Sequence, residues 1–231
     1  MTVDCQPLDQ SEISNLQNVF TRFGNRENLM NGLDLLSEIP SNSIPLAFFD
    51  PQYRGIMDKM RYGNEGARQK DRFTLHQMNE ETIMEFISEI SRILKPSGHA
   101  MLWVDKFHLC SGIFPWLVNS NLSIVDMMTW DKGKIGMGYR TRRRSEYMII
   151  LQKMPLRAKG LWRDRGIPDV IQERQPKNHP HAKPEEMQRR LIMALTDPGD
   201  WVCDPAAGGY SVMRSAMVCG RNFIGADLGK I

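Results

Sequence analysis

The sequence predicts an α/β fold whose sheet is mostly parallel, on three observations. Residues 46–49, Leu-Ala-Phe-Phe, form an apolar run without alternation, which is typical of a strand buried on both faces of a parallel sheet. Near the carboxyl terminus, residues 201–227 have the pattern of a strand, a glycine turn, a helix and a second strand that ends in an acid. Amphipathic helical stretches separate the apolar strands, whereas residues 124–130 and 147–151 are most simply an antiparallel pair.

The whole chain has the composition of an ordinary globular protein. Its 231 residues are 41% hydrophobic and 25% charged, so we expect one domain over residues 1–231 with insertions. The formal net charge of +3 is only mildly basic, and a site for a polyanion must therefore come from local clustering. The first residues lack a basic-then-apolar leader, and no window of about 18 apolar residues exists, so we expect a cytoplasmic protein without a membrane partner. The 4 cysteines lack metal-ligand spacing, and we expect no metal.

Two short helices precede the apolar strand. Residues 11–23 carry apolar side chains at helical spacing, and residues 33–39 have the pattern of a second helix. Between them, Leu29-Met30 suggests a short strand. Residues 40–43, Pro-Ser-Asn-Ser, form a turn that leads into the strand at 46–49.

The middle of the chain continues the alternation of helix and strand. Residues 80–94 have one apolar face and predict a helix that stops at the Lys-Pro-Ser-Gly sequence of residues 95–98. Residues 101–104 predict the next buried strand, and residues 107–118 predict a helix interrupted near Pro115.

The carboxyl-terminal part supplies two more helices and two more strands. Pro184 is a good first residue for a helix that runs to about residue 195. Residues 201–203 predict a strand, and the following helix runs through Val218. Residues 222–226 predict the last strand.

The first candidate site follows the strand at residues 46–49, where α/β folds place their ligands. Pro51 fixes its own φ and biases Asp50 toward an extended conformation. Asp50, the Pro51 carbonyl and the Tyr53 ring suit a planar molecule that carries an exocyclic amino group. The ring would stack on Tyr53, while Asp50 and Pro51 would accept the two amino hydrogens. An ordinary Asp-Pro turn is the alternative.

The second candidate site is the strand–turn–helix–strand unit near the carboxyl terminus. Glycines let the backbone approach a nucleoside, the helix begins beside it, and an acid accepts ribose hydroxyls. Asp227 follows Gly208 by 19 residues, close to the expected spacing of about 20. The Gly-x-Gly-x-x-Gly pattern of dinucleotide sites is absent, and Asp204 instead suits a cationic ligand. The alternative is that this unit binds a nucleotide of some other kind.

Basic residues gather in three segments, which we expect to face nucleic acid at about residues 54–75, 131–145 and 153–178. The segment 131–145 carries six lysines and arginines against one acid, with three glycines and Tyr139 among them. A solvated surface is the alternative. The candidate contacts are Arg54, Arg61, Arg68, Lys132, Tyr139, Arg140, Arg142, Arg143 and Arg144.

The sequence at residues 50–53, Asp-Pro-Gln-Tyr, resembles a family motif. It is similar to the Asp/Asn/Ser-Pro-Pro-aromatic motif of the S-adenosylmethionine-dependent amino methyltransferases, which modify adenine N6 or cytosine N4 in DNA. The basic middle is followed by His-Pro-x-x-Lys-Pro at residues 179–184 and Asp-Pro-x-x-Gly at residues 204–208. This order resembles the permuted β group of the family over most of residues 29–227.

The resemblance implies a Rossmann-like methyltransferase sheet, mostly parallel with an antiparallel hairpin and circularly permuted. The implied reaction moves a methyl group from S-adenosylmethionine to the exocyclic amino group of a base flipped out of double-stranded DNA. Adenine N6 is the expected target. Cytosine N4 and a non-catalytic DNA-binding relative are the alternatives, and a homodimer or a cognate nuclease stays open.

The resemblance also assigns roles to residues. Asp50, Pro51, Gln52 and Tyr53 form the implied catalytic motif. Three departures are Gln52 in place of a second proline, Tyr210 in place of a second glycine, and His181-Ala182 in place of Thr-Gln. The implied cofactor residues are Asn31, His179, His181, Lys183, Asp204, Pro205, Ala206, Gly208, Gly209, Ser211 and Asp227.

Overall fold

The structure is a computed structural model that describes residues 10–52, 78–136, 140–175 and 182–229. Seven strands form one sheet in the order β5-β3-β4-β2-β1-β6-β7. Their bounds are β1 Ile44–Phe49, β2 Leu94–Val104, β3 Leu122–Asp131, β4 Ser145–Lys153, β5 Val170–Gln172, β6 Trp201–Asp204 and β7 Asn222–Gly225.

Only β4 runs against its neighbours in this sheet, because it pairs antiparallel with both β2 and β3 while the other pairings are parallel. The predicted class, a mostly parallel sheet with one antiparallel hairpin, is therefore confirmed. The described helices are α1 Gln10–Phe23, α2 Gly32–Glu38, α4 Glu80–Ile93, α5 Lys106–Ser111, α6 Phe114–Leu117, α7 Glu185–Leu195 and α8 Ser211–Val218.

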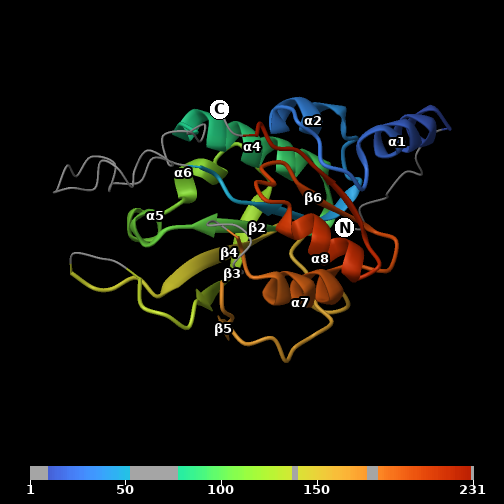
Figure 1. Ribbon diagram of the computed structural model, residues 1–231. Helices are drawn as coiled ribbons and strands as arrows, with labels where there is room; N and C mark the ends of the chain where they lie inside the picture. The colour runs from blue at the N-terminus through green and yellow to red at the C-terminus, as the bar shows by residue number, and fades with distance from the viewer. Residues whose placement is uncertain (1–9, 53–77, 137–139, 176–181, 230–231) are drawn as a thin grey trace.

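Helices cover both faces of the sheet (Figure 1). On one face α1, α2, α4 and α6 pack over the sheet around one cluster of buried apolar side chains. On the other face α7 and α8 lie over a second cluster. This arrangement explains why the β1 run does not alternate: Ala47 and Phe49 belong to the first cluster, and Leu46 and Phe48 to the second.

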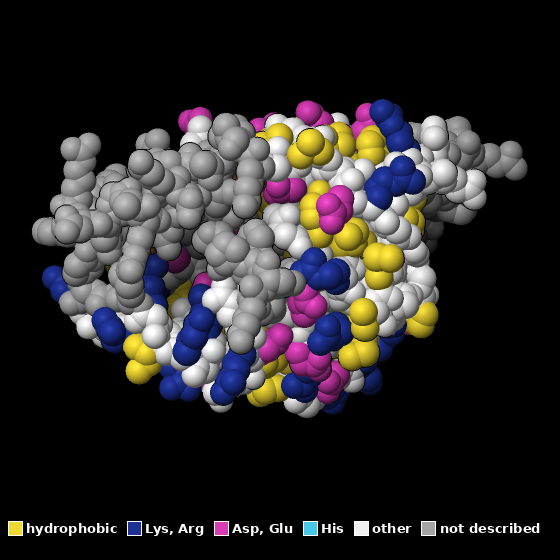
Figure 2. All heavy atoms as spheres, viewed as in Figure 1, with side chains coloured by type: hydrophobic (Ala, Val, Ile, Leu, Met, Phe, Trp, Pro, Cys, Tyr) yellow, Lys and Arg dark blue, Asp and Glu magenta, His cyan; other side chains and the backbone are white. Residues whose placement is uncertain are grey.

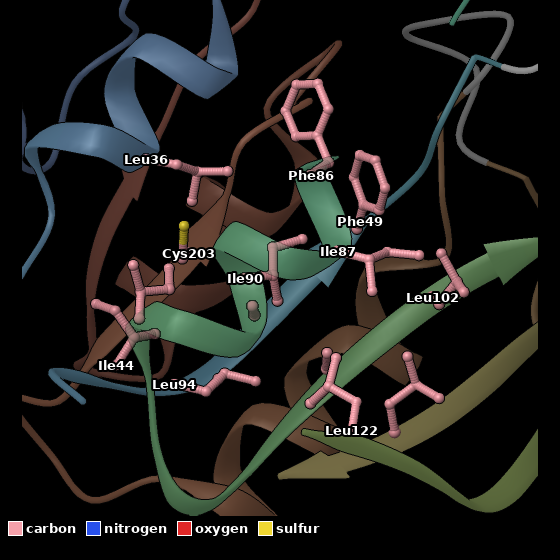
Figure 3. Close-up of a cluster of buried hydrophobic side chains, with 14 of the residues drawn as sticks. Leu36, Ile44, Phe49, Phe86, Ile87, Ile90, Leu94, Leu102, Leu122 and Cys203 are labelled. Atoms are coloured by element: carbon pink, nitrogen blue, oxygen red, sulfur yellow. The ribbon is translucent and has the colours of Figure 1, made fainter. Parts of the chain in front are cut away.

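The amphipathic pattern of α4 matches its packing. Phe86, Ile87 and Ile90 point from α4 onto the sheet, toward side chains of β1 and β2 (Figure 3). The Phe86 ring stacks on Phe49 with 5.1 Å between centroids. Asn79 caps the helix start by accepting from the Thr82 N–H at 2.7 Å. The helix thus supports β1 directly beneath the point where the strand ends in Asp50.

Residues 24–29 and residues 224–227, far apart in the sequence, meet at the edge of the sheet. Gly24 forms an antiparallel bridge with Ile224, and Leu29 forms a parallel bridge with Asp227. The buried Asn28 side chain joins them, because its Nδ2 donates to the carbonyls of Phe23 and Gly225 at 2.9 and 2.8 Å. The segment before α2 therefore continues the sheet beyond β7.

Several element boundaries differ from the expectation. Strand β2 begins at Leu94, the last residue of the expected helix, and it includes residues 95–98, where that helix was expected to stop, with an irregular register against β1. The helix expected at 107–118 is two helices, and the break falls at Gly112, whose φ is +86°, rather than at Pro115. Leu29-Met30 forms a single bridge rather than a strand.

The segment 153–178 contains β5, which the sequence did not reveal. Val170–Gln172 pairs parallel with the end of β3, and three residues are too few for a periodic signal. Among the described residues, no helix is both long and apolar enough to cross a membrane.

Candidate active site

A pocket of about 720 Å³ lies at the edge of the sheet where the parallel strands end. Strands β1 and β6 end there in Asp50 and Asp204, and β4 begins there because it runs in the opposite direction. The predicted site residues that line this pocket are Asn31, Asp50, Gln52, Lys183, Asp204, Pro205, Ala206, Gly208, Gly209, Ser211 and Asp227.

Asp204 is the most buried acid of the pocket, with 5% of its surface exposed. Its Oδ1 accepts from the Ala206 N–H at 3.2 Å, and no described lysine or arginine forms an ion pair with it. Burial raises the pKa of the Asp204 carboxyl well above its usual range, the Ala206 N–H opposes this, and the nearby carboxylates of Asp50 and Asp227 raise it further. A cationic ligand would give the Asp204 carboxylate a positively charged partner.

Asp227 holds the glycine turn in place. Its Oδ2 accepts from the Gly208 N–H at 3.0 Å, and its Oδ1 accepts from the Gly229 N–H at 2.8 Å. Gly208 has a φ of +50°, in the left-handed region that favours glycine. Asp227, which was predicted to bind a ribose, is therefore hydrogen-bonded to the glycine turn at Gly208, which was predicted to let the backbone approach the ligand.

Tyr210, the departure from the expected second glycine, turns its ring into the core. The ring is 7% exposed and packs edge-on against Phe223 with 6.2 Å between centroids. The Tyr210 hydroxyl donates to the Asn28 carbonyl at 3.0 Å and lies 3.1 Å from the Asn28 N–H, from which it accepts. Burial raises the pKa of Tyr210 to about 12. Tyr210 thus ties the glycine turn to the amino-terminal segment.

Asn31 and Gly32 form the wall where α2 begins. Asn31 caps the helix by accepting from the Leu33 N–H at 2.9 Å. A Cβ on Gly32 would overlap the Pro205 carbonyl, so the close approach of α2 to the turn after β6 requires glycine at this position. Ser211, at the start of α8, accepts from Gln188 of α7 at 3.0 Å.

A second wall, formed by Asp50 and Lys183, adjoins a set of paired charges. The Lys183 ammonium lies 3.1 Å from the Asp50 Oδ2 and 2.9 Å from the Glu146 Oε2. The Glu146 Oε1 binds the ammonium of Lys132. Lys183 also lies over the Trp103 ring, 4.5 Å from its centroid.

The paired charges shift the pKa values of this wall. Burial would raise the pKa of Glu146, but the ammonium groups of Lys183 and Lys132 outweigh it and lower the pKa to about 2. Burial would lower the pKa of Lys183, but Asp50 and Glu146 outweigh it and raise the pKa. Glu146 was missed in the sequence, where the one available signal was an acid directly before a strand that begins at this edge.

The remaining predicted catalytic and cofactor residues divide into two groups. Pro51 is buried, and the Gln52 carbonyl accepts from the Met78 N–H at 2.8 Å. Tyr53, His179 and His181 lie outside the described residues.

The basic segments are described only in part. The described arginines at 140 and 142–144 are exposed, and lysine and arginine side chains follow the lower left of the molecule, where the β3–β4 hairpin lies (Figure 2). Arg144 forms two hydrogen bonds of 2.7 Å with Asp131, and these lower the pKa of Asp131 to about 2. Arg54, Arg61, Arg68 and Tyr139 lie outside the described residues.

Comparison with known proteins gives the family. The model of the N6/N4 "DNA methylase" family matches residues 156–230. Type II methyltransferase M.HhaII of Haemophilus parahaemolyticus is 56% identical over 212 residues, which cover 90% of this chain and 93% of that protein. The chain belongs to the DNA amino methyltransferases.

Two further proteins extend the comparison. DNA adenine methyltransferase YhdJ of Escherichia coli K12 is 28% identical, over 90% of this chain and 81% of that protein. The crystal structure of the M1.HpyAVI–SAM complex has a TM-score of 0.63 at 14% identity, over 88% of this chain and 93% of that one. At this identity the likeness shows a shared fold.

Proposed function

We propose that this protein methylates adenine N6 in double-stranded DNA with S-adenosylmethionine as the donor. One observation carries the proposal. The same pocket is lined by Asp204, which is buried and has no ion pair with a described lysine or arginine, and by Asp50, the acid of the catalytic motif. Adenine is favoured because YhdJ, named an adenine methyltransferase, is similar along 90% of this chain.

The residues of one wall fit the donor. Asp204 would offer its carboxylate to the cationic methionine end, with Ser211 and the Gly208-Gly209 turn beside it. Asp227 would accept from ribose hydroxyls, and Asn31 would lie near the adenine of the cofactor. When bound, S-adenosylmethionine supplies a sulfonium methyl group that is already activated for transfer. M1.HpyAVI, which has the same fold, was solved as a complex with SAM.

The residues of the other wall would hold the target base. Asp50 and the Pro51 carbonyl would accept the two amino hydrogens, which lets the nitrogen lone pair localise as the methyl group arrives. Their negative charge would stabilise the positive charge that develops on nitrogen. Tyr53 would stack on the flipped base and offset part of the unstacking cost of a few kcal/mol.

The arrangement of the chain also supports the proposal. The catalytic motif comes before the cofactor turn in the sequence, and the segment before α2 continues the sheet beyond β7. We interpret this order as a circular permutation of one domain, with the basic segments at about 54–75, 131–145 and 153–178 facing DNA.

Methyl transfer tests the function directly. Purified protein is incubated with duplex DNA and labelled S-adenosylmethionine, and the DNA is digested to nucleosides for mass spectrometry. Labelled N6-methyladenine is the expected product, and Asp50→Ala is the matched negative control. If the labelled product were N4-methylcytosine, the target base would be cytosine instead of adenine. DNA binding without incorporation would instead favour a non-catalytic relative.

A further inference from the structure

Four charged side chains of alternating sign form a continuous chain beside the pocket: Asp50, Lys183, Glu146 and Lys132. They come from the end of β1, the segment before α7, the start of β4 and the segment after β3. Glu146 uses one carboxylate oxygen for each lysine. The four charges cancel, so the group forms a balanced network within the protein.

Protein groups contact the Lys183 ammonium on several sides. An ammonium has three N–H donors, and here Asp50 accepts at 3.1 Å and Glu146 at 2.9 Å. The Trp103 ring lies 4.5 Å away on a further side and offers its negative face. The Lys183 side chain is 16% exposed. Its charge therefore acts on these protein groups, and Asp50 is one of them.

Asp50 is held by a side chain from elsewhere in the fold. It is the first residue after β1, where the hydrogen-bonded ladder with β2 has ended at Phe49. A carboxylate that accepts amino hydrogens in the transition state is effective only if its position is set beforehand. Lys183 holds the Asp50 Oδ2, and Glu146, anchored at the start of β4, holds Lys183.

We infer that Lys183 and Glu146 are positioning residues for Asp50, an inference that rests on the proposed methyl transfer. Glu146 shares the ammonium of Lys183, so that Lys183 orients Asp50 without taking up its whole capacity as an acceptor. If Glu146 lost its charge, Lys183 would pair with Asp50 alone. Asp50 would then accept the target amino group less well, while the donor wall at Asp204 stays intact.

Glu146→Gln tests the inference at nearly unchanged side-chain volume. Single-turnover methyl transfer at saturating DNA and donor is expected to slow by about tenfold or more, as when the residue that orients a functional group is removed. Affinity for S-adenosylmethionine, measured by calorimetry, is expected to stay within about twofold. Glu89→Gln is the matched control, because Glu89 pairs with Arg92 at 2.8 Å on α4, outside the pocket. A wild-type transfer rate in Glu146→Gln would overturn the inference.

A double-variant cycle separates positioning from general destabilisation. If Glu146 acts through Lys183, then Glu146→Gln/Lys183→Gln should transfer no more slowly than Lys183→Gln alone. Fully additive losses would overturn the inference. Should Glu146→Gln fail to fold, Glu146→Asp keeps the charge but withdraws it from Lys183, and a wild-type rate in that variant would also overturn it.

The proposed function and this inference fail in different ways. Near-normal transfer by Asp50→Ala would remove the proposed catalytic role of Asp50 and the inference with it. Loss of transfer in Asp50→Ala together with a normal rate in Glu146→Gln would remove the inference alone.

Discussion

The two walls of the pocket treat their carboxylates in opposite ways. Asp204 is buried, receives a backbone N–H, and forms no ion pair with a described lysine or arginine. Asp50 lies next to Lys183, within a network whose charges cancel. The difference fits the proposed roles of the two acids: an unbalanced buried acid would favour a cation, and an acid within a balanced network would be held in position to meet a neutral amino group.

Physical chemistry explains how the fold tolerates both. An isolated buried carboxylate is costly, and for this reason burial raises the pKa of Asp204. Asp50 is only partly buried, and it pairs with Lys183. A positively charged donor would give Asp204 the cationic partner that Lys183 gives Asp50.

The largest effect is expected from Asp50→Ala, which removes the acceptor of the balanced wall. Single-turnover methyl transfer should fall by about 10²–10³-fold, the usual loss for one preorganised group that stabilises transition-state charge. Calorimetric affinity for S-adenosylmethionine should be unchanged, because Asp204 and Asp227 remain. Near-normal transfer would show that the catalytic assignment is wrong.

Asp204→Asn should act on the other wall. Donor affinity should weaken by about 2–5 kcal/mol, because a buried cation loses its charged partner. Because burial raises the pKa of Asp204 and a cationic donor would lower it, wild-type affinity should rise with pH over the range in which free Asp204 titrates, and binding in that range should release a proton. Calorimetry in two buffers of different ionisation enthalpy measures that proton. Proton release that persists in Asp204→Asn would point to another group.

Asp227→Ala should have a smaller effect on the same wall. Losing an ionised acceptor for ribose hydroxyls should weaken donor binding by about 1–3 kcal/mol. Because Asp227 also accepts from Gly208 and Gly229, part of the loss would come from a looser turn. Adenosine, which keeps the ribose but lacks the cationic end, is the matched ligand. If affinity for adenosine were unaffected, the ribose would bind elsewhere.

The hairpin arginines should affect DNA binding but neither wall. Arg142→Ala/Arg143→Ala should weaken DNA binding and reduce the slope of log affinity against log salt by about 0.9 per lost phosphate contact. Arg144 is set apart because Asp131 already holds its guanidinium at 2.7 Å. Arg22→Ala removes one exposed charge from α1 and serves as the control. An unaltered slope would make the cluster a solvated surface.

The smallest effect concerns stability in acid. The lowered pKa of Glu146, about 2 against an ordinary 4.5, means that its ion pairs stabilise the fold above about pH 4.5 and lose this effect as pH falls toward 2. The melting temperature of the wild type should exceed that of Glu146→Gln at pH 7, and the gap should narrow between pH 5 and pH 3. A constant gap would mean that Glu146 contributes through packing instead.

The sequence revealed the wall around Asp204 better than the wall around Asp50. Asp204, Gly208 and Asp227 belong to one contiguous unit of strand, turn and helix, in which local spacing determines which groups meet. The buried run of β1 and the antiparallel pair β3–β4 were predictable because apolar patterning reports burial directly.

The balanced network could not be predicted, because its members come from distant parts of the chain. Glu146 meets Lys183 across 37 residues, and only the antiparallel direction of β4 brings its first residues to the pocket edge. Lys132 was expected to contact DNA as part of the basic, glycine-containing segment 131–145, and that role stays a prediction, although its ammonium binds Glu146. Tyr210 was recognised as a departure from the family's second glycine, but no local pattern could reveal that its ring enters the core.

The most direct test of the contrast between the two walls is the single-turnover rate of methyl transfer as a function of S-adenosylmethionine concentration. Asp204→Asn should approach the wild-type rate at saturating donor, because its defect is in binding. Asp50→Ala should stay slow at every concentration, because its defect is in the transfer step. The opposite result, with Asp50→Ala rescued by the donor and Asp204→Asn not, would contradict the division of roles between the two walls.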